Sequence, residues 1–131
     1  MLWVGRVAVV TLPTEIDVSN ADQASHDLAT VARDASLVIA DMSATTFCDS
    51  AGVTALVRAV RKANASGARL RVAASAPAVT RVLAITGVNR LIEVYPSVAA
   101  AMADSVRGSA GQGNATRRGQ ADADGRAPQP G

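Results

Sequence analysis

Aromatic residues and cysteine are scarce in this sequence of 131 residues. Trp3, Phe47 and Tyr95 are its only aromatic residues, and they lie far apart. Such spacing provides no platform for stacking bases, and a formal net charge of only +2 gives no strong attraction to a phosphate backbone. We therefore expect no direct binding of nucleic acid. The single cysteine, Cys48, excludes an internal disulfide and favours a reducing, cytoplasmic location.

Long apolar runs are also absent. No stretch approaches the roughly 18 to 20 consecutive apolar residues that are needed to span a bilayer, so we expect no membrane association. The N-terminal segment does not have the pattern of a signal peptide, because its short apolar run soon meets Pro13, Glu15 and Asp17.

Signatures of catalysis and of cofactor binding are missing as well. The sequence contains no G-x-x-x-x-G-K-[ST] or G-x-G-x-x-G loop for a nucleotide, so no cofactor is expected. His26 is the only histidine, and without a cysteine pair at ligand spacing it predicts no metal site. Ser50 lacks the Gly-x-Ser-x-Gly elbow of a hydrolase, and His26, the candidate general base, is remote in sequence. We therefore expect a protein that is not an enzyme and has no catalytic residues.

Aliphatic residues dominate what is present. Apolar residues make up 49% of the chain, and their spacing alternates between the periods of strands and of helices. We predict strands at 6–12, 37–41, 69–73 and 91–94, each followed by a helix, at about 20–33, 50–66, 77–86 and 97–106. This order predicts an α/β fold with a mostly parallel central sheet and about four helices.

Composition divides the chain near residue 107. From Gly108 onward the sequence is rich in Gly, Pro and polar residues and cannot bury a core. We expect a single domain at residues 1–107 and a disordered C-terminal tail at 108–131. Within the domain, Ser19 or Asn20 is expected to cap the first helix.

The helix predicted at 50–66 shows clear periodicity. Val53, Leu56, Val57 and Val60 recur at i, i+3, i+4 and i+7, which predicts that they share a buried face. Gly67 supplies the expected stop at its C-terminal end.

The junction between a short apolar segment and this helix carries the strongest candidate site. Ser50 stands at the expected helix start, where unpaired backbone N–H groups create a partial positive charge that could accommodate a phosphate. Phosphorylation would add about −1.5 to −2 charges beside the carboxylate of Asp49. We expect this to affect a docked partner more than the fold. The alternative interpretation is that Asp49 and Ser50 only cap the helix.

A resemblance to a known family rests on these residues. The run from Ala40 to Val53, which contains Asp41-Met42-Ser43 and Phe47-Cys48-Asp49-Ser50-Ala51-Gly52, resembles the phosphorylation signature of anti-sigma factor antagonists in the STAS family. In that family a strand ends in Asp-Leu-Ser, a Phe-x-Asp-Ser-x-Gly turn follows, and the Ser after this second Asp receives the phosphate. The resemblance therefore implies a single STAS-like domain in which Ser50 is the phosphorylation site.

Further segments share the resemblance, which runs from about Val7 to Met102. Glu15-Ile16-Asp17 resembles the Gly-Glu-Leu-Asp turn of the family, where acidic residues lie near the partner surface, although Thr14 stands in place of the Gly. The family usually begins with an additional edge strand, for which Met1 to Gly5 is available. The segments that match farther along are 67–70, 77–79 and 83–88.

The resemblance also implies partners. An anti-sigma factor with serine kinase activity would bind the unphosphorylated domain, free its sigma factor, and then phosphorylate Ser50, and a PP2C-type phosphatase would reset the site. Such partner switching regulates transcription, for example in a stress response. The partner-binding surface expected here comprises Glu15, Asp17, Asp49, Ser50 and Gly52. The alternative is an unmodified STAS scaffold subunit of a transporter or signalling assembly.

Cys48 lies beside the proposed switch and allows two interpretations. A redox sensor would need a lowered thiol pKa, whereas the adjacent carboxylate of Asp49 should raise it. We therefore expect a partly buried structural thiol.

Overall fold

The computed structural model describes residues 1–103, and the predicted tail at 108–131 lies outside the described residues. Most predicted elements are present in the predicted order. The elements are β1 (Leu2–Val4), β2 (Val7–Thr11), β3 (Glu15–Ile16), α1 (Ala21–Ala32), β4 (Leu37–Asp41), β5 (Phe47–Cys48), α2 (Ser50–Ala65), β6 (Arg69–Ala73), α3 (Pro77–Ile85), the 3-10 turn η1 (Val88–Arg90) and β7 (Glu93–Tyr95). A further helical segment begins at residue 98 and continues to the end of the described residues.

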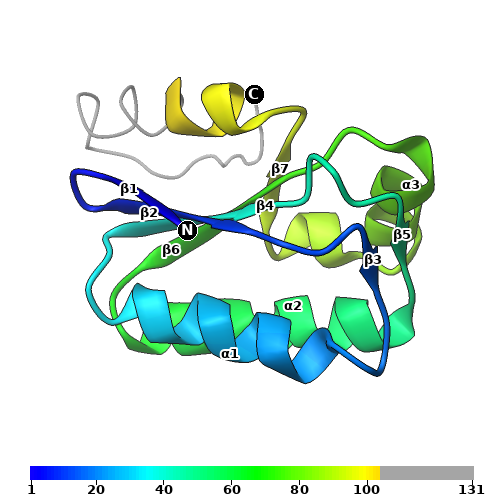
Figure 1. Cartoon of the computed structure of the whole chain (residues 1–131), viewed down its shortest axis with the longest axis horizontal. Coiled ribbons are helices and arrows are strands. Elements are labelled where there is room, and N and C mark those ends of the chain that lie inside the picture. Colours follow the sequence, from blue (N-terminus) through cyan, green and yellow to red (C-terminus); the bar gives the residue numbers. More distant parts are fainter. Residues whose placement is uncertain (104–131) are drawn as a thin grey trace. The chain divides into compact units, whose positions relative to one another are not determined.

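The main sheet has five strands in the order β1-β2-β4-β6-β7. All neighbours pair in parallel except β1, which pairs antiparallel with β2 at the edge of the sheet (Figure 1). The expected α/β fold with a mostly parallel sheet is therefore confirmed. The short edge strand expected between Met1 and Gly5 is present as β1.

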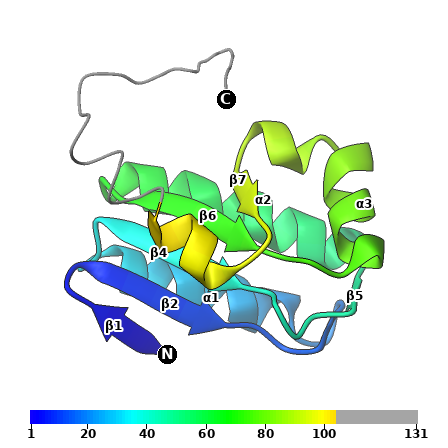
Figure 2. The ribbon, with the colours of Figure 1, turned by 90° about the horizontal axis from the view of Figure 1, so that it is seen from above.

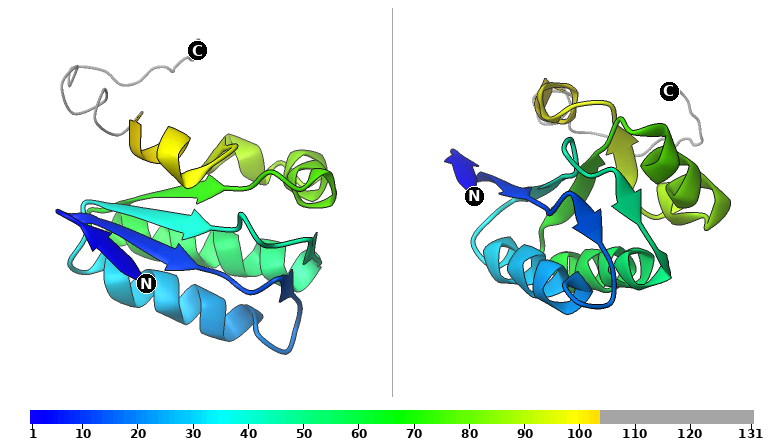
Figure 3. Two further views of the ribbon diagram at one scale, coloured as in Figure 1. Left: turned by 45° about the horizontal axis from the view of Figure 1, so that its top comes forward. Right: turned by 45° about the vertical axis from the view of Figure 1, so that its right-hand side comes forward.

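Both faces of this sheet are covered. Figure 3 shows α1 and α2 side by side on one face and the helical residues 98–101 on the other. A strand that is covered on both faces is expected to be apolar along its length. Strand β4 fits this expectation, because Leu37 to Ala40 are all buried. Aliphatic side chains and alanines form the core between α1, α2 and the sheet, as the scarcity of aromatic residues requires.

Arg71 on β6 shows how complete this cover is. The alternating pattern of 69–73 would place both Arg69 and Arg71 in solvent, yet the side chain of Arg71 is only 3% exposed. Its Nε donates to Glu93 Oε1 at 2.8 Å, and its Nη1 donates to the carbonyl of Ala101 at 2.9 Å. The guanidinium also lies 5.4 Å from the ring centre of Tyr95. This buried cation therefore links β6, β7 and the helical residues 98–101.

The buried face of α2 differs from the predicted one. Leu56 and Val60 are buried as expected, but Val53 and Val57 are only half-buried at the border of the core. The remaining buried positions of the helix are Gly52, Ala55, Ala59 and Ala63. Small residues face α1 and the sheet because they allow close approach of the backbones, and a count of large apolar residues misses such a face.

The starts of α1 and of β7 differ in smaller ways from the prediction. Asn20 precedes α1, but its side chain makes no capping hydrogen bond to that helix. The last strand begins at Glu93 rather than Leu91, because η1 occupies the preceding residues and leaves Leu91 exposed.

A second, two-stranded sheet was not predicted. Strand β3 pairs in parallel with β5, so that Glu15 lies opposite Phe47 and Ile16 opposite Cys48. Ile16 and Cys48 point into the core. Strands of two residues are too short to produce a detectable period, which explains why periodicity missed this pair.

Gly52 lies directly under this small sheet. A Cβ atom placed on Gly52 would lie 2.5 Å from Cys48 Sγ and 2.9 Å from Ile16 Cγ2. Real Cβ atoms do not approach other atoms so closely, so the first turn of α2 packs against β3 and β5 at a distance that only glycine allows.

We predict that Gly52→Ala destabilises the fold. Overpacking should cost about 1–3 kcal/mol, of which better helix propensity returns up to about 1 kcal/mol. Equilibrium urea unfolding should show a net loss, and the additional change Cys48→Ala should reduce that loss because it removes Sγ. The exposed substitution Thr54→Ala on the same helix is the control and should change stability by less than about 0.5 kcal/mol. A Gly52→Ala variant more stable than the parent would contradict this packing.

A second prediction concerns Cys48, a residue that is only 3% exposed. Burial, and to a smaller extent the charge of Asp49, raises its pKa to about 11. The folded state thus holds the thiol proton more tightly than the unfolded chain, in which the pKa of a thiol is about 8.5. The stability from the neutral thiol is therefore present at neutral pH and is lost between about pH 8.5 and about pH 11.

The measurement is the free energy of unfolding across this alkaline range for the parent and for Cys48→Ala. All other titratable groups are common to the two proteins, so the difference in slope isolates the thiol. The parent should lose stability more steeply, and equal slopes would contradict the assignment.

Candidate partner-binding site at the start of helix α2

Ser50 is exposed and is the first residue of α2. Asp49 precedes it with extended backbone angles (φ −97°, ψ −170°) and acts as the N-cap. Its Oδ1 accepts hydrogen bonds from the N–H groups of Ala51 at 2.9 Å and of Gly52 at 3.3 Å. Capping by Asp49 explains why the helix begins here, and it turns the side chain of Ser50 outward.

The capping contacts change one expectation from the sequence. We expected unpaired N–H groups at the helix start that could accommodate a phosphate, but two of them already donate to Asp49. A phosphate on Ser50 would therefore meet a carboxylate that occupies these donors rather than a vacant anion site. The interaction beside Ser50 is consequently more repulsive than the sequence alone indicated.

The pairing of β3 with β5 brings the two acidic segments together. The N–H of Asp49 donates to the carbonyl of Ile16 at 3.2 Å, and the N–H of Thr46 donates to the carbonyl of Thr14 at 2.8 Å. Glu15 and Asp17 flank Ile16, so they lie beside the segment that carries Asp49 and Ser50. The structure thus brings together four of the five residues predicted for the partner surface. Thr14, which replaces the glycine of the family, is compatible with this pairing.

Asp17 is held in a tight turn before α1. Its Oδ1 accepts hydrogen bonds from the hydroxyl and from the N–H of Ser19, and both lower the pKa of this carboxyl. Asn20 donates through Nδ2 to the carbonyl of Glu15 at 2.8 Å and accepts from the N–H of Asp17 at 3.0 Å. The side chain of Asn20 therefore orders this acidic turn instead of capping the helix, and Asp17 stays ionised at neutral pH.

Gly52, the fifth predicted residue, is buried. It offers no side chain to a partner, and its position against Cys48 and Ile16 gives it a packing role. Its contribution to the surface is indirect, because it allows α2 to start close to the small sheet and so determines where Ser50 is displayed.

Thr45 is an organising residue that the sequence did not reveal. It is fully buried, and its Oγ1 donates to the carbonyl of Pro13 at 2.7 Å. This bond joins the loop after β4 to the loop after β2, just before β3 and β5 pair. A buried hydroxyl without such an acceptor would be costly, so Thr45 fixes the relative position of the two loops.

Two exposed apolar side chains were also missed. Phe47 is 48% exposed although it is the only phenylalanine, and Val18 is 82% exposed in the acidic turn. Val18 follows Asp17 in the chain, and Phe47 lies opposite Glu15 in the β3–β5 pair. Exposed apolar groups beside charged ones are typical of protein interfaces. A lone aromatic residue directly before the Cys-Asp-Ser run was the signal that could have identified Phe47.

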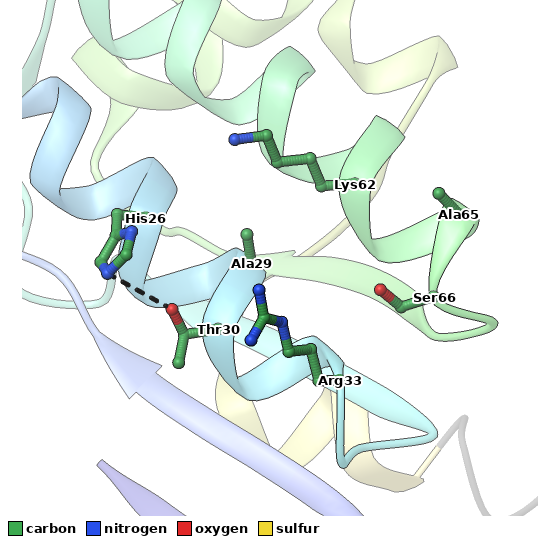
Figure 4. A pocket seen from close by; sticks show the side chains of 7 residues that line it. All are labelled: His26, Ala29, Thr30, Arg33, Lys62, Ala65 and Ser66. Atoms are coloured by element: carbon green, nitrogen blue, oxygen red, sulfur yellow. Dashed lines mark hydrogen bonds between the residues drawn. The ribbon is translucent and has the colours of Figure 1, made fainter.

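Other candidate groups in the described residues lie elsewhere. A groove of about 340 Å³ runs between α1 and α2. Figure 4 shows that it is lined by His26, which is hydrogen-bonded to Thr30, and by the cationic side chains of Arg33 and Lys62. All four of these side chains are exposed. Residues 1–103 contain no group of three or more potential ligands that could hold a metal ion. None of their helices has the length and apolar character needed to cross a membrane.

Comparisons with known proteins agree with the resemblance in the sequence. The protein-family model of the STAS domain matches residues 3–101 of the chain. The structure is similar to that of an anti-sigma factor antagonist from Mycobacterium paratuberculosis, with 26% sequence identity, a TM-score of 0.71 and coverage of 79% of this chain and 88% of that one. No curated protein matches the chain.

Two further solved structures share the fold at lower identity. The anti-sigma factor antagonist SpoIIAA in its unphosphorylated form is 22% identical, with a TM-score of 0.67 and coverage of 82% of this chain and 94% of that one. The STAS domain of a SulP transporter from Vibrio cholerae is 17% identical, with a TM-score of 0.69 and coverage of 85% and 89%. From the matched residues and the shared architecture, we conclude that the chain belongs to the STAS domain family.

Proposed function

We propose that this chain is an anti-sigma factor antagonist, a binding module that is switched by phosphorylation of Ser50. In its unphosphorylated form it binds an anti-sigma factor with serine kinase activity and so frees a sigma factor. The kinase then phosphorylates Ser50 with its own ATP, which ends the complex, and a PP2C-type phosphatase restores the binding form. The observation that carries the proposal is the exposed hydroxyl of Ser50 beside the capping carboxylate of Asp49.

Charge supplies the physical basis of the switch. Glu15, Asp17 and Asp49 already give this surface a negative character that suits a cationic partner surface. A phosphate would add about −1.5 to −2 charges next to Asp49. In solvent this addition is screened, so the domain tolerates it. In a desolvated interface the same dianion lacks compensation and costs several kcal/mol.

The apolar side chains add affinity without charge. Phe47 and Val18 present exposed apolar area near the acidic groups. Buried apolar anchors surrounded by polar contacts supply most of the binding energy in typical interfaces. The site is therefore suited to binding a protein, and the buried Cys48 provides no accessible nucleophile for catalysis.

A scaffold role in a transporter or signalling assembly is the competing function. The similarity to the SulP transporter domain, at 17% identity, indicates the fold alone. Purification of the full chain with its natural partner distinguishes the two functions. A small ATP-binding kinase in the complex supports the switch, whereas a membrane transporter contradicts it.

We predict that Ser50→Ala retains binding to the kinase and loses phosphorylation, whereas Ser50→Asp weakens binding by at least about tenfold. Calorimetry with the purified kinase measures the affinity, and mass spectrometry after incubation with ATP locates the phosphate. The control is Ser66→Asp, which introduces the same charge at an exposed serine at the other end of α2. If Ser50→Asp and Ser66→Asp bind equally well, the switch does not operate through charge at this position.

A second variant separates the capping role of Asp49 from its charge. Asparagine caps helices as well as aspartate does, so Asp49→Asn should change the free energy of unfolding by less than about 0.5 kcal/mol. It removes the negative charge beside Ser50, so the loss of affinity caused by Ser50→Asp should become about threefold smaller in this background. An undiminished loss would show that Asp49 takes no part in the repulsion.

A further inference from the structure

Strand β1, which forms one of the two edges of the main sheet, is apolar. Figure 2 shows β1 as the outermost strand, with none of the other described elements beyond it. Met1 is 73% exposed, Leu2 59%, Trp3 42% and Val4 47%. Soluble proteins usually protect such edges with charged side chains, proline or a covering loop. The segment from Met1 to Val4 contains no charged side chain.

The register with β2 shows that both faces of β1 are apolar. Trp3 lies opposite Ala8, which belongs to the core beneath α1, so the Trp3 side chain is on the α1 side of the sheet. Leu2 and Val4 lie opposite Val9 and Val7 and are therefore on the other side. An incoming strand would meet apolar side chains on both faces.

Helix α1 does not close against this edge. A hollow of about 320 Å³ lies between Met1, the end of β2 at Val10 and Thr11, and the outer side of α1 at His26, Asp27, Thr30 and Val31. Met1 precedes Trp3 by two residues and so shares its side of the strand. The α1 side of the edge therefore has room for additional side chains.

We propose that β1 pairs antiparallel with β1 of a second copy of this chain, which joins the two sheets into one. An unpaired strand edge accepts another strand, and a two-fold axis makes the contact self-complementary. With the axis at Trp3, the two Trp3 residues lie opposite each other, and Leu2 of each copy lies opposite Val4 of the other. Apolar side chains thus meet apolar side chains at every pair within the strand.

The charges near the edge are compatible with this pairing. Arg6 carries the charged side chain nearest to the β1 segment. In the antiparallel arrangement Met1 of one copy lies opposite Gly5 of the other, and Arg6 lies beyond the paired residues. The two Arg6 side chains are therefore not placed opposite each other, whereas an in-register parallel arrangement would bring them together.

Trp3 reports on this contact directly because it is the only tryptophan in the chain. The full chain is diluted from submillimolar to nanomolar concentration, and its fluorescence emission is recorded together with its mass from sedimentation equilibrium. The proposal expects a dimer at high concentration, and a shift of the emission to longer wavelength as the dimer dissociates. A monomer at all concentrations, or an emission that does not change with concentration because other residues of the same chain cover Trp3, overturns it.

A matched pair of variants tests the register. Leu2→Lys/Val4→Lys places like charges opposite each other across the two-fold axis, whereas Leu2→Glu/Val4→Lys places opposite charges there. Both remove the same apolar side chains from exposed positions, so circular dichroism should show the parent fold in each. The dissociation constant of the Lys/Lys dimer should exceed that of the Glu/Lys dimer by about tenfold.

Leu91→Lys is the control, because it removes a side chain that is 61% exposed outside β1. It should dimerise like the parent. Equal dissociation constants for the two double variants would overturn the proposed register, and a dimer weakened as strongly by Leu91→Lys would overturn the assignment of the contact to β1.

Discussion

The parallel pairing of β3 with β5 is the constraint on which the site depends. Each strand has only two residues, and the pair lies outside the main sheet. It nevertheless joins the connection after β2 to the connection after β4, with Thr45 and Thr46 bonded to the carbonyls of Pro13 and Thr14. Without this pairing, the acidic turn and the start of α2 would be two independent loops. With it, they form one surface at the end of the domain.

The same pairing explains why a glycine follows two residues after Ser50. Ile16 and Cys48, the inward residues of the two short strands, occupy the space into which a side chain at Gly52 would project. The helix can therefore begin close to the strands only if this residue has no Cβ. Asp49 completes the arrangement, because its main-chain N–H binds the carbonyl of Ile16 while its side chain caps the helix. Display of Ser50 in solvent is a consequence of these contacts.

Whether a helix or strand could be predicted from the sequence depends mainly on its length. Strands such as β4 and helices such as α2 were predicted from composition and period, because they are long enough for a pattern to appear. The pair β3–β5 and the burial of Arg71 were not, since both depend on contacts between segments distant in sequence. Alanine and glycine on the buried face of α2 carry little hydrophobic signal, so the predicted face included Val53 and Val57 at its border.

The candidate site was found by a different route. Periodicity indicated only that a helix begins near Ser50, and the resemblance of the surrounding motif selected that residue among many exposed serines. The geometry adds what neither could supply, namely that Asp49 already uses the N–H groups that would otherwise favour a phosphate. Because the helix start is occupied by an anion, a second anion at Ser50 has no internal partner among these donors. A second anion therefore changes the affinity for a partner that binds this surface, and regulation of binding does not require a change in the fold.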